Sequence, residues 1–481
     1  MINQLSVFGM SSGTFTLDGS QVHLKEVVRA LPAKRLVCRA LWRGQDTYIK
    51  LFFGASAKKY ALRDELGVNY LSTAQILTPP LLYAGGVDNM SVLALVFQAI
   101  PKAENAEFIY QQISLVEREI LLLGLVKVLA QHHQANIIQT DLYLKNFLVS
   151  GDDIYTLDGD GIRQYRSLSR KQALKNLAVL ISKFDVLDVE RCLPKLLDVY
   201  AIARNWSSVP DLLSFKRLVN QHRTVVASHY ADKKVFRQCT DVNIYRQSRL
   251  FEAVSSGFSS EQLPISVHAC NRLIEEGISL KKGNTCTVSL AEIDGIRTVL
   301  KRYNIKSFWH GINRAFRQTR AAASWANAHR LNILGIATPK PIALIEERFG
   351  YFRGKAYFLS EYLDAPDAST FFAQIKNKKS QAEAIQNIVE MFYRMYWLKL
   401  SHGDMKANNI KVLDGKPYLI DLDSMQQHAW DFVAKKRHAK DLKRFMRNWQ
   451  DQPTLYNTFV KAFFAVYADS QVLRLAGLSV D

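Results

Sequence analysis

Alternation and helical periodicity predict a β-rich segment followed by a helical segment in each half of the chain. In the first half, Thr47–Phe52 alternates in polarity, and Val92–Phe97 is an apolar run of strand length. Lys59–Thr73 has a helical pattern. A further helix, expected to be buried, is indicated by apolar residues at helical spacing, namely Ile113, Val116, Ile120 and Leu123.

The second half repeats this order of patterns. The turn sequence Asp294-Gly295 separates Thr285–Leu290 from Arg297–Lys301 and predicts a β-hairpin. Tyr357–Tyr362 is typical of a strand that leads into a hinge. A helix is predicted where apolar residues recur at helical spacing, namely at Ile388, Met391, Phe392 and Met395.

A cluster of polar residues follows this last helix. Asp404 comes directly after His402-Gly403, Asn409 comes five residues later, and Asp421 ends the next apolar strand. Carboxylate and amide oxygens at loop and strand ends are suitable ligands for a Mg²⁺ ion that also binds a nucleotide phosphate.

The spacing of these residues matches the phosphoryl-transfer set of the protein-kinase-like fold. In this interpretation Asp404 accepts the proton of the substrate hydroxyl, and Lys406 steadies the transferring phosphoryl group. Asn409 and Asp421 are the predicted metal ligands.

The same spacing occurs earlier in the chain. Asp141, Asn146 and Asp158 precede Asp404, Asn409 and Asp421 by a constant 263 residues, and Asp160 precedes Asp423 by the same offset. Asp141 is therefore a second candidate base, and Asn146 and Asp158 are a second candidate metal pair. Identical spacing in two places predicts a tandem duplication.

The fold class that follows is α+β, with two tandem protein-kinase-like domains. Each is expected to have a small β-rich N-lobe and a helical C-lobe, over residues 1–240 and 241–481. In such folds a strand lysine contacts the nucleotide phosphates and pairs with a helix carboxylate. We expect Lys50 and Glu65 to form this pair in the first domain. Lys301 is the counterpart of Lys50, and Glu361 is expected beside the adenine.

The two halves depart from the pattern in different ways. Neither contains Gly-x-Gly-x-x-Gly, and the first has Gln139-Thr140 where the second has His402-Gly403. Between Lys301 and Glu346 there is no acidic residue, so Lys301 lacks a helix carboxylate, and Trp325, Asn327 or His329 is expected in that region.

Two basic segments are notable. Residues 301–340 contain eight Lys or Arg and no Asp or Glu, which predicts either a solvated helix or an anionic partner. Residues 435–447 contain Asp441 as their only carboxylate. This second segment is expected either to anchor the candidate catalytic loop or to make local salt bridges.

Composition supports a two-domain globular protein. The chain has 481 residues, of which 48% are hydrophobic and 22% charged, and its five cysteines form no Cys-x-x-Cys pair. No signal-peptide pattern or apolar run of membrane-spanning length occurs, so we expect a cytoplasmic protein. The net charge of +19 indicates either a polyanionic partner or a solubilising surface.

The second half resembles the bacterial lipopolysaccharide core kinases, the Kdo/heptose kinase group. Four segments carry the resemblance besides the loop 402–409, namely Trp325–Leu331, Gly335–Pro341, Asp421–Asp423 and Arg444–Trp449. The resemblance implies ATP, Mg²⁺ and a sugar hydroxyl as acceptor. It also implies a lipid-linked phosphorylated glycan and peripheral contact with the anionic inner-membrane surface.

Two alternatives remain open at this point. His-Gly-Asp also occurs in other small-molecule phosphotransferases, whereas a lysine two residues after the aspartate is typical of protein kinases. The acceptor could therefore be a protein or another small molecule. The departures in each half also fit a double pseudokinase that acts as a scaffold. A nucleic-acid binder is disfavoured because no recognised motif accompanies the charge.

Overall fold

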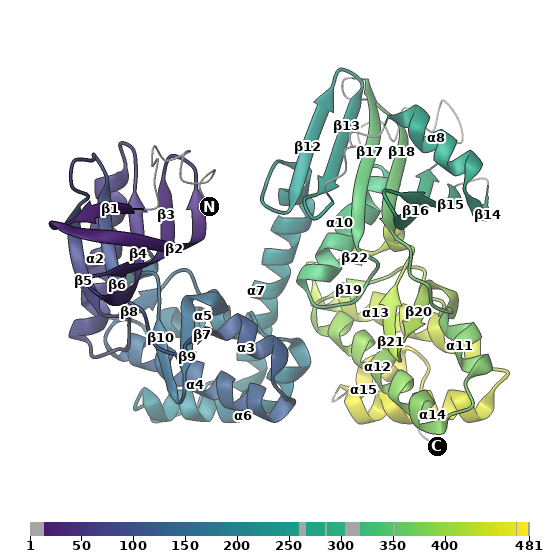
Figure 1. The fold of residues 1–481 in the computed structure, drawn as a ribbon. Coiled ribbons are helices and arrows are strands. Elements are labelled where there is room, and N and C mark those ends of the chain that lie inside the picture. Colours follow the sequence, from purple (N-terminus) through teal and green to yellow (C-terminus); the bar gives the residue numbers. More distant parts are fainter. Residues whose placement is uncertain are drawn as a thin grey trace. The chain divides into compact units, whose positions relative to one another are not determined.

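The computed structural model describes residues 14–258, 266–283, 286–303, 318–349, 352–467 and 469–479 (Figure 1). Contacts within the chain define two compact units, Met1–Val219 and Asn220–Asp481. This division precedes the boundary near residue 240 that the sequence suggests. Helix α7 (Leu212–Asp232) runs across the division. Each unit is described separately below.

The first unit begins with a six-stranded antiparallel sheet in the order β1-β2-β3-β4-β6-β5. Its strands are β1 (Thr14–Leu17), β2 (Ser20–Leu31), β3 (Arg35–Trp42), β4 (Gln45–Phe52), β5 (Leu81–Gly86) and β6 (Leu93–Gln98). Helix α2 (Ala57–Thr73) follows β4 and packs on the sheet through Val68, Phe52 and Leu95. The predicted strands and the predicted helix of this region are confirmed.

Helices make up most of the rest of the first unit. The elements are β7 (Glu104–Asn105), α3 (Ala106–Gln112), α4 (Leu115–Gln134), β8 (Ile137–Gln139), β9 (Phe147–Ser150), β10 (Asp153–Thr156), β11 (Ile162–Gln164), α5 (Arg170–Ile181) and α6 (Val186–Ala203). The short 3₁₀ turn η1 (Leu144–Asn146) contains Asn146, and η2 (Gly159–Gly161) directly follows Asp158.

The predicted buried helix exists as α4, but its predicted buried face is wrong. Val116 and Ile120 are 72% and 63% exposed, whereas Leu121, Leu125 and Leu129 are buried in the core. The helix carries leucine or valine on several faces, so apolar spacing alone does not select the face that packs. Ile113 lies at the C-terminal end of α3 rather than in α4.

The second unit contains a seven-stranded antiparallel sheet in the order β12-β13-β17-β18-β16-β15-β14. Its strands are β12 (Val242–Gln247), β13 (Leu250–Ser255), β14 (Ile278–Lys282), β15 (Cys286–Ile293), β16 (Ile296–Tyr303), β17 (Pro341–Phe349) and β18 (Phe352–Glu361). The predicted hairpin at Asp294-Gly295 joins β15 to β16. Helices α8 (Val267–Glu276) and α10 (Arg320–Ile333) accompany the sheet.

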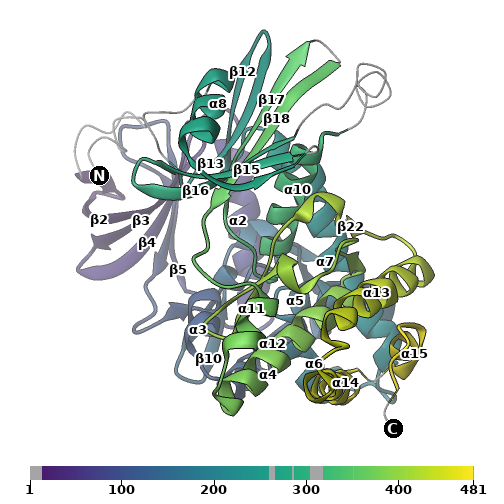
Figure 2. The same cartoon turned by 90° about the vertical axis from the view of Figure 1, so that its right-hand side faces the viewer.

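The remaining elements of the second unit form its helical part (Figure 2). They are α11 (Ala368–Gln374), α12 (Lys378–Trp397), β19 (Leu400–Ser401), η4 (Ala407–Asn409), β20 (Ile410–Leu413), β21 (Lys416–Leu419), η5 (Leu422–Ser424), β22 (Gln426–Gln427), α13 (Asp431–Met446), η6 (Arg447–Trp449), α14 (Pro453–Val466) and α15 (Ser470–Leu475). The stripe predicted from Ile388 to Met395 is buried in α12, as expected. Phe392 packs edge-on against Phe463 of α14, with ring centroids 5.6 Å apart.

Both units therefore show a mixed α and β composition in which an antiparallel sheet precedes a helical part. In each, a long helix, a short strand, a 3₁₀ turn and a two-stranded hairpin follow one another in the same order. Among the described residues, no helix combines the length and apolar character needed to cross a bilayer.

The buried histidine His438 makes the stability of the second unit depend on pH. Burial lowers the pKa of His438 to about 3, whereas the side chain takes up a proton near pH 6.5 in an unfolded chain. The free energy of unfolding is therefore highest above pH 6.5, and it falls as the pH is lowered from 6.5 toward 3, because the unfolded chain binds a proton that the folded chain does not. In the wild type, this titration should lower the free energy of unfolding by roughly 1.4 kcal/mol between pH 7.5 and pH 5.5. His438→Gln should lack this part of the decrease.

Urea unfolding at these two pH values measures this difference. His268→Gln, which changes an exposed histidine of the same unit, is the control and should leave the pH dependence unchanged. An unaltered pH dependence in His438→Gln would show that this histidine is not the titrating group.

Candidate functional site

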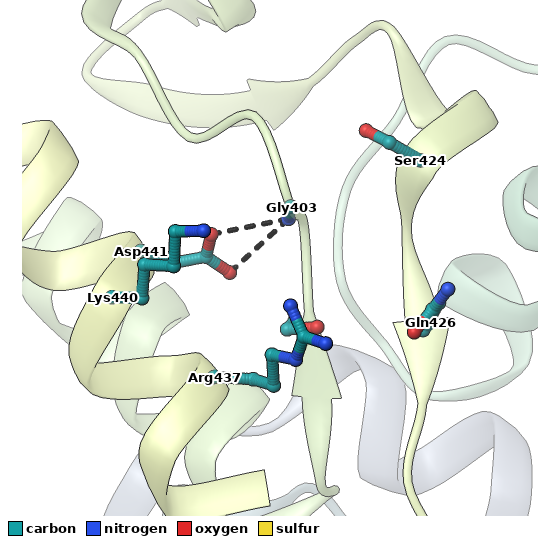
Figure 3. A pocket seen from close by; sticks show the side chains of 7 residues that line it. Gly403, Ser424, Gln426, Arg437, Lys440 and Asp441 are labelled. Atoms are coloured by element: carbon teal, nitrogen blue, oxygen red, sulfur yellow. Dashed lines mark hydrogen bonds between the residues drawn. The ribbon is translucent and has the colours of Figure 1, made fainter. Parts of the chain in front are cut away.

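The candidate catalytic loop of the second unit is held by a buried carboxylate on α13. Asp441 is 2% exposed and accepts hydrogen bonds from the backbone N–H groups of His402, at 2.6 Å, and Gly403, at 3.1 Å (Figure 3). The His402 side chain donates from Nε2 to the carbonyl of Ile420 at 2.9 Å. Both alternatives for the basic segment 435–447 therefore occur, because Asp441 anchors the loop and Lys435 forms an ion pair with Asp469.

Gly403 is required by the geometry of this turn. Its φ is +79°, a value that L side chains rarely adopt. A Cβ atom at this position would also lie 2.9 Å from the carbonyl oxygen of Ser424. Ser424 in turn donates its hydroxyl to the carbonyl of His402 at 3.0 Å, so the turn is fixed from both sides.

Asp404 lies between two cations. Lys406 is 3.3 Å from its carboxylate, and Arg444 of α13 forms a closer ion pair with the same oxygen. Asn409 donates its side-chain amide to the carbonyl of Asp404 at 2.8 Å. The structure thus brings Asp404, Lys406 and Asn409 together as predicted and adds Arg444, whose role the sequence does not single out from its basic neighbours.

Asp421 and Lys301 form an ion pair that joins the sheet to the loop region of the second unit. Lys301 also lies 3.5 Å from Asp423. Burial lowers the pKa of Lys301, but Tyr303 and the carboxylates of Asp421 and Asp423 outweigh this effect, and the pKa is raised overall. Burial likewise opposes the charge on Asp421, whose pKa is nevertheless lowered by Lys301.

Helix α10 donates to this region instead of supplying a carboxylate. Arg320 lies 2.6 Å from Asp423, and Asn327 donates to the carbonyls of Leu422 and Met425 at 2.8 and 3.0 Å. Trp325 and His329 are buried on the same helix. The expectation that Lys301 lacks a helix carboxylate holds for α10; within the basic segment 301–340, residues 304–317 lie outside those described.

The first unit has a helix carboxylate, but it is a different residue from the one predicted. Lys50 of β4 lies 2.6 Å from Asp64 of α2 and 3.3 Å from Asp158. The predicted pair between Lys50 and Glu65 is wrong, because Asp64 is fully buried against the sheet and Glu65 lies on a partly exposed face of α2. Burial is the largest effect on Asp64 and raises its pKa.

A contact between two glycines sets this helix position. A Cβ atom at Gly67 of α2 or at Gly159 of η2 would overlap the backbone of the facing segment. The helix therefore lies directly on the turn that follows Asp158. This close approach turns Asp64 toward Lys50, and Arg63 forms an ion pair with Asp160.

The loop of the first unit keeps the same hydrogen-bond frame with different side chains. Asn146 donates to the carbonyl of Asp141 at 2.8 Å, as Asn409 does to Asp404. Gln139 donates to the carbonyl of Leu157 at 3.2 Å and so replaces His402. The structure shows no ion pair to Asp141 within residues 14–258, and Lys145 packs against the ring of Tyr143.

The predicted metal ligands have the right donor chemistry for Mg²⁺. In both units the asparagine amide N–H₂ donates to a backbone carbonyl, so Oδ1 is the atom available to a cation. Asp158 and Asp421 have φ values of +67° and +60°, a left-handed conformation in which aspartate is enriched. One carboxylate and one amide suit Mg²⁺, which takes few protein ligands and keeps several waters. No cluster of three His, Cys, Asp or Glu able to bind a metal occurs among the described residues.

Glu361, predicted beside the adenine, ends β18. Its backbone N–H donates to the carbonyl of Lys340 at 3.0 Å, and its carboxylate lies 3.7 Å from the Lys340 ammonium. Its role toward a nucleotide stays a prediction.

Comparison with known proteins identifies the region around this site. Residues 275–467 match the lipopolysaccharide kinase (Kdo/WaaP) family. The second unit resembles this kinase family. The match includes Lys301, the loop 402–409 and Asp421, and it confirms the resemblance inferred from the sequence.

Individual relatives match a similar share of the chain. The 3-deoxy-D-manno-octulosonic acid kinase of Mannheimia succiniciproducens is 29% identical over 203 residues, which are 38% of this chain and 83% of that protein. The enzyme of the same name from Pasteurella multocida is 24% identical over 190 residues, 37% and 76% of the two chains. Among solved structures, that of vaccinia related kinase 3 is matched over 48% of this chain and 95% of its own, at 14% identity and a TM-score of 0.29.

The correction at α2 leads to a testable difference between neighbouring residues. Asp64→Asn leaves Lys50 short of a buried partner, which should cost about 3 kcal/mol. Glu65→Gln changes a partly exposed residue and should cost less than about 0.5 kcal/mol. Hydrogen–deuterium exchange of peptides from α2 measures both, and Asp64→Asn alone should exchange roughly a hundredfold faster. Equal effects of the two substitutions would contradict the assigned pairing.

Proposed function

We propose that the second unit transfers the γ-phosphoryl group of ATP to a hydroxyl of a sugar in the inner core of lipopolysaccharide. The main support is that the family match spans Lys301, Asp404, Asn409 and Asp421. Two relatives named for the phosphorylation of 3-deoxy-D-manno-octulosonic acid (Kdo) make a Kdo residue the first acceptor to test.

In the proposed reaction, Asp404 orients the sugar hydroxyl and accepts its proton. The hydroxyl oxygen forms a bond to the γ-phosphorus while the bond from that phosphorus to the bridging oxygen breaks, and ADP leaves. Lys406 and Arg444 are placed beside Asp404 to stabilise negative charge around the reacting groups. Catalysis rests on positioning and charge neutralisation.

Asn409 and Asp421 hold Mg²⁺ in this proposal, and Lys301 contacts the α- and β-phosphates. The bound cation neutralises phosphate charge that would otherwise repel the attacking oxygen. The ion pair between Lys301 and Asp421 keeps both groups charged and close together before substrates bind.

Asp141, Asn146, Asp158 and Lys50 form the corresponding proposed site in the first unit. Asp404 has two cationic neighbours, whereas the loop of Asp141 places Lys145 on Tyr143. This difference favours the second unit as the site of transfer and a structural or regulatory role for the first. In the scaffold alternative, both units have a structural or regulatory role and neither transfers phosphate.

The proposed acceptor is a lipid-linked phosphorylated glycan, reached by peripheral contact with the cytoplasmic face of the inner membrane. The start of α13 has suitable chemistry for this contact. Trp430 is 69% exposed, Phe432 is 71% exposed, and Lys436 lies exposed one helical turn after Phe432. Exposed aromatic rings next to cations are favoured at an anionic membrane interface. We call these three residues the aromatic-basic patch.

A pair of matched substitutions tests the reaction. Asp404→Ala should reduce phosphate transfer from ATP to a Kdo–lipid A acceptor at least a hundredfold, because the proposed base is removed. Asp141→Ala removes the equivalent group of the first unit and should leave the rate within twofold of wild type. Transfer of radiolabelled phosphate to the acceptor measures both.

Other outcomes select the alternatives. Loss of activity only in Asp141→Ala would assign the reaction to the first unit. A wild-type rate in Asp404→Ala would show the assignment of the base to be wrong. A wild-type protein that neither transfers phosphate nor binds ATP would favour the scaffold, and transfer to protein alone would change the acceptor class.

The aromatic-basic patch predicts membrane binding that depends on two residue types. Trp430→Ala combined with Phe432→Ala should weaken binding to vesicles of phosphatidylcholine and phosphatidylglycerol at least tenfold, since two apolar rings lose their burial. Lys436→Gln should weaken binding only to vesicles that contain the anionic lipid. Co-sedimentation provides the measurement.

Phe108→Ala is the matched control, because Phe108 is 47% exposed on α3 of the first unit and lies outside the patch. An equal loss of binding in Phe108→Ala, or none in the double variant, would rule out this patch as the membrane contact.

A further inference from the structure

A pocket of about 210 Å³ lies beside the candidate catalytic loop of the second unit. Gly403, which lines it, directly precedes Asp404, and Ser424, which also lines it, directly follows Asp423. The other lining residues are Ser401, Gln426, Arg437, Lys440 and Asp441. The pocket therefore lies next to the loop that carries Asp404 and to the turn that follows Asp421. None of the groups proposed to react or to bind ATP lines it.

Two cations of α13 give the pocket its charge. Arg437 and Lys440 are exposed and are three residues apart on one helix, so they lie on the same side and repel each other. The structure shows no ion pair for either of them among residues 352–467 and 469–479. An anion placed between them would relieve this repulsion.

Asp441, the only acidic residue that lines the pocket, already accepts hydrogen bonds from the protein backbone. Both oxygens of Asp441 face the backbone N–H groups of His402 and Gly403, which compensate its charge. Figure 3 shows the bonds between Asp441 and Gly403 on one wall, with Arg437 extending into the space beneath Gly403 and Gln426 on the opposite side.

The remaining polar side chains also suit an anion. The hydroxyls of Ser401 and Ser424 are engaged by His428 and by the carbonyl of His402, respectively. The side-chain amide of Gln426 can then serve as a third donor beside Arg437 and Lys440. A guanidinium fork, an ammonium and an amide are together well suited to the oxygens of a phosphate or a carboxylate.

We propose that this pocket binds an oxyanion of the acceptor, a phosphate or carboxylate group, and thereby positions the acceptor hydroxyl at Asp404. The acceptor part of this inference rests on the proposed function. The anion-binding part rests on the pocket alone, since its residues differ from those proposed to contact ATP.

Substitutions within α13 test the proposal against a matched control. Arg437→Gln and Lys440→Gln each remove one pocket cation. Lys443→Gln removes one exposed cation from the next turn of the same helix, outside the pocket. All three lose one charge, so a general effect of helix charge would appear equally in each.

The first measurement is independent of enzymatic activity. Inorganic phosphate, compared with chloride at equal ionic strength, should raise the melting temperature of wild type, Lys443→Gln and Lys301→Gln. It should have less than half of that effect on Arg437→Gln and Lys440→Gln. Loss of the phosphate effect in Lys301→Gln but not in the pocket variants would place phosphate in the proposed ATP site and overturn the inference.

The second measurement is the KM for a Kdo–lipid A acceptor. Arg437→Gln and Lys440→Gln should raise this KM at least tenfold and leave the KM for ATP within twofold, whereas Lys443→Gln should change neither. A phosphate effect that depends on the pocket together with an unchanged acceptor KM would mean that the pocket binds free anions only. If wild type phosphorylates no Kdo acceptor, the proposed function fails while the phosphate titration still decides on anion binding.

Discussion

The carboxylate of Asp441 sets the conformation on which the second unit's loop depends. It lies at the C-terminal half of α13 and accepts the N–H groups of two consecutive loop residues. Without it, the buried N–H of His402 would lack a partner, at a cost of about 1–3 kcal/mol, and the partly buried N–H of Gly403 would lose its acceptor. Because Asp441 fixes the turn, Arg444 one helical turn later reaches Asp404, and Arg437 one turn earlier reaches the pocket. The helix that anchors the loop thereby also places cations on either side of it.

The two units show how one backbone frame accommodates different charges. Gln139 replaces His402 and still donates to the carbonyl that precedes the strand-end aspartate. Asp64 offers Lys50 a carboxylate from a helix, whereas Lys301 relies on Asp421 and Asp423. Both units also keep the ion pair between the strand lysine and the strand-end aspartate, Lys50 with Asp158 and Lys301 with Asp421. They differ in the further carboxylate that the lysine contacts and in how the loop is anchored, which is compatible with any arrangement that satisfies the buried backbone groups.

Much of the architecture could be predicted because it depends on local patterns. The strands around Lys50 and Lys301 and the buried stripe of α12 follow from alternation and helical spacing. The grouping of Asp404, Lys406 and Asn409 follows from their position on one short loop. The sequence does not distinguish Glu65 from Asp64, because the rotation of α2 depends on the contact between Gly67 and Gly159, which are distant in sequence. Nor does it show that Val116 and Ile120 face outward, because α4 has apolar residues on several faces.

Residues that act across the fold were the hardest to predict. Arg444 is one of seven cations in residues 435–447, and only the packing of α13 shows that it reaches Asp404. The pocket beside Gly403 likewise requires knowledge of how β19, β22 and α13 meet. The sequence indicated that this basic segment would matter, but not which of its side chains would face the loop.

The backbone contact between Gly67 and Gly159 has a consequence for motion. Helix α2 is seated on the turn after Asp158 without intervening side chains, so it cannot shift by small rotamer changes. Any displacement would open a gap along the whole contact and break the pair between Lys50 and Asp64 at the same time. Helix α10 contacts the equivalent turn of the second unit through the side chains of Arg320 and Asn327. A side chain added at Gly67 or Gly159 would therefore have to displace a whole helix, whereas a substitution at Arg320 or Asn327 would remove single contacts.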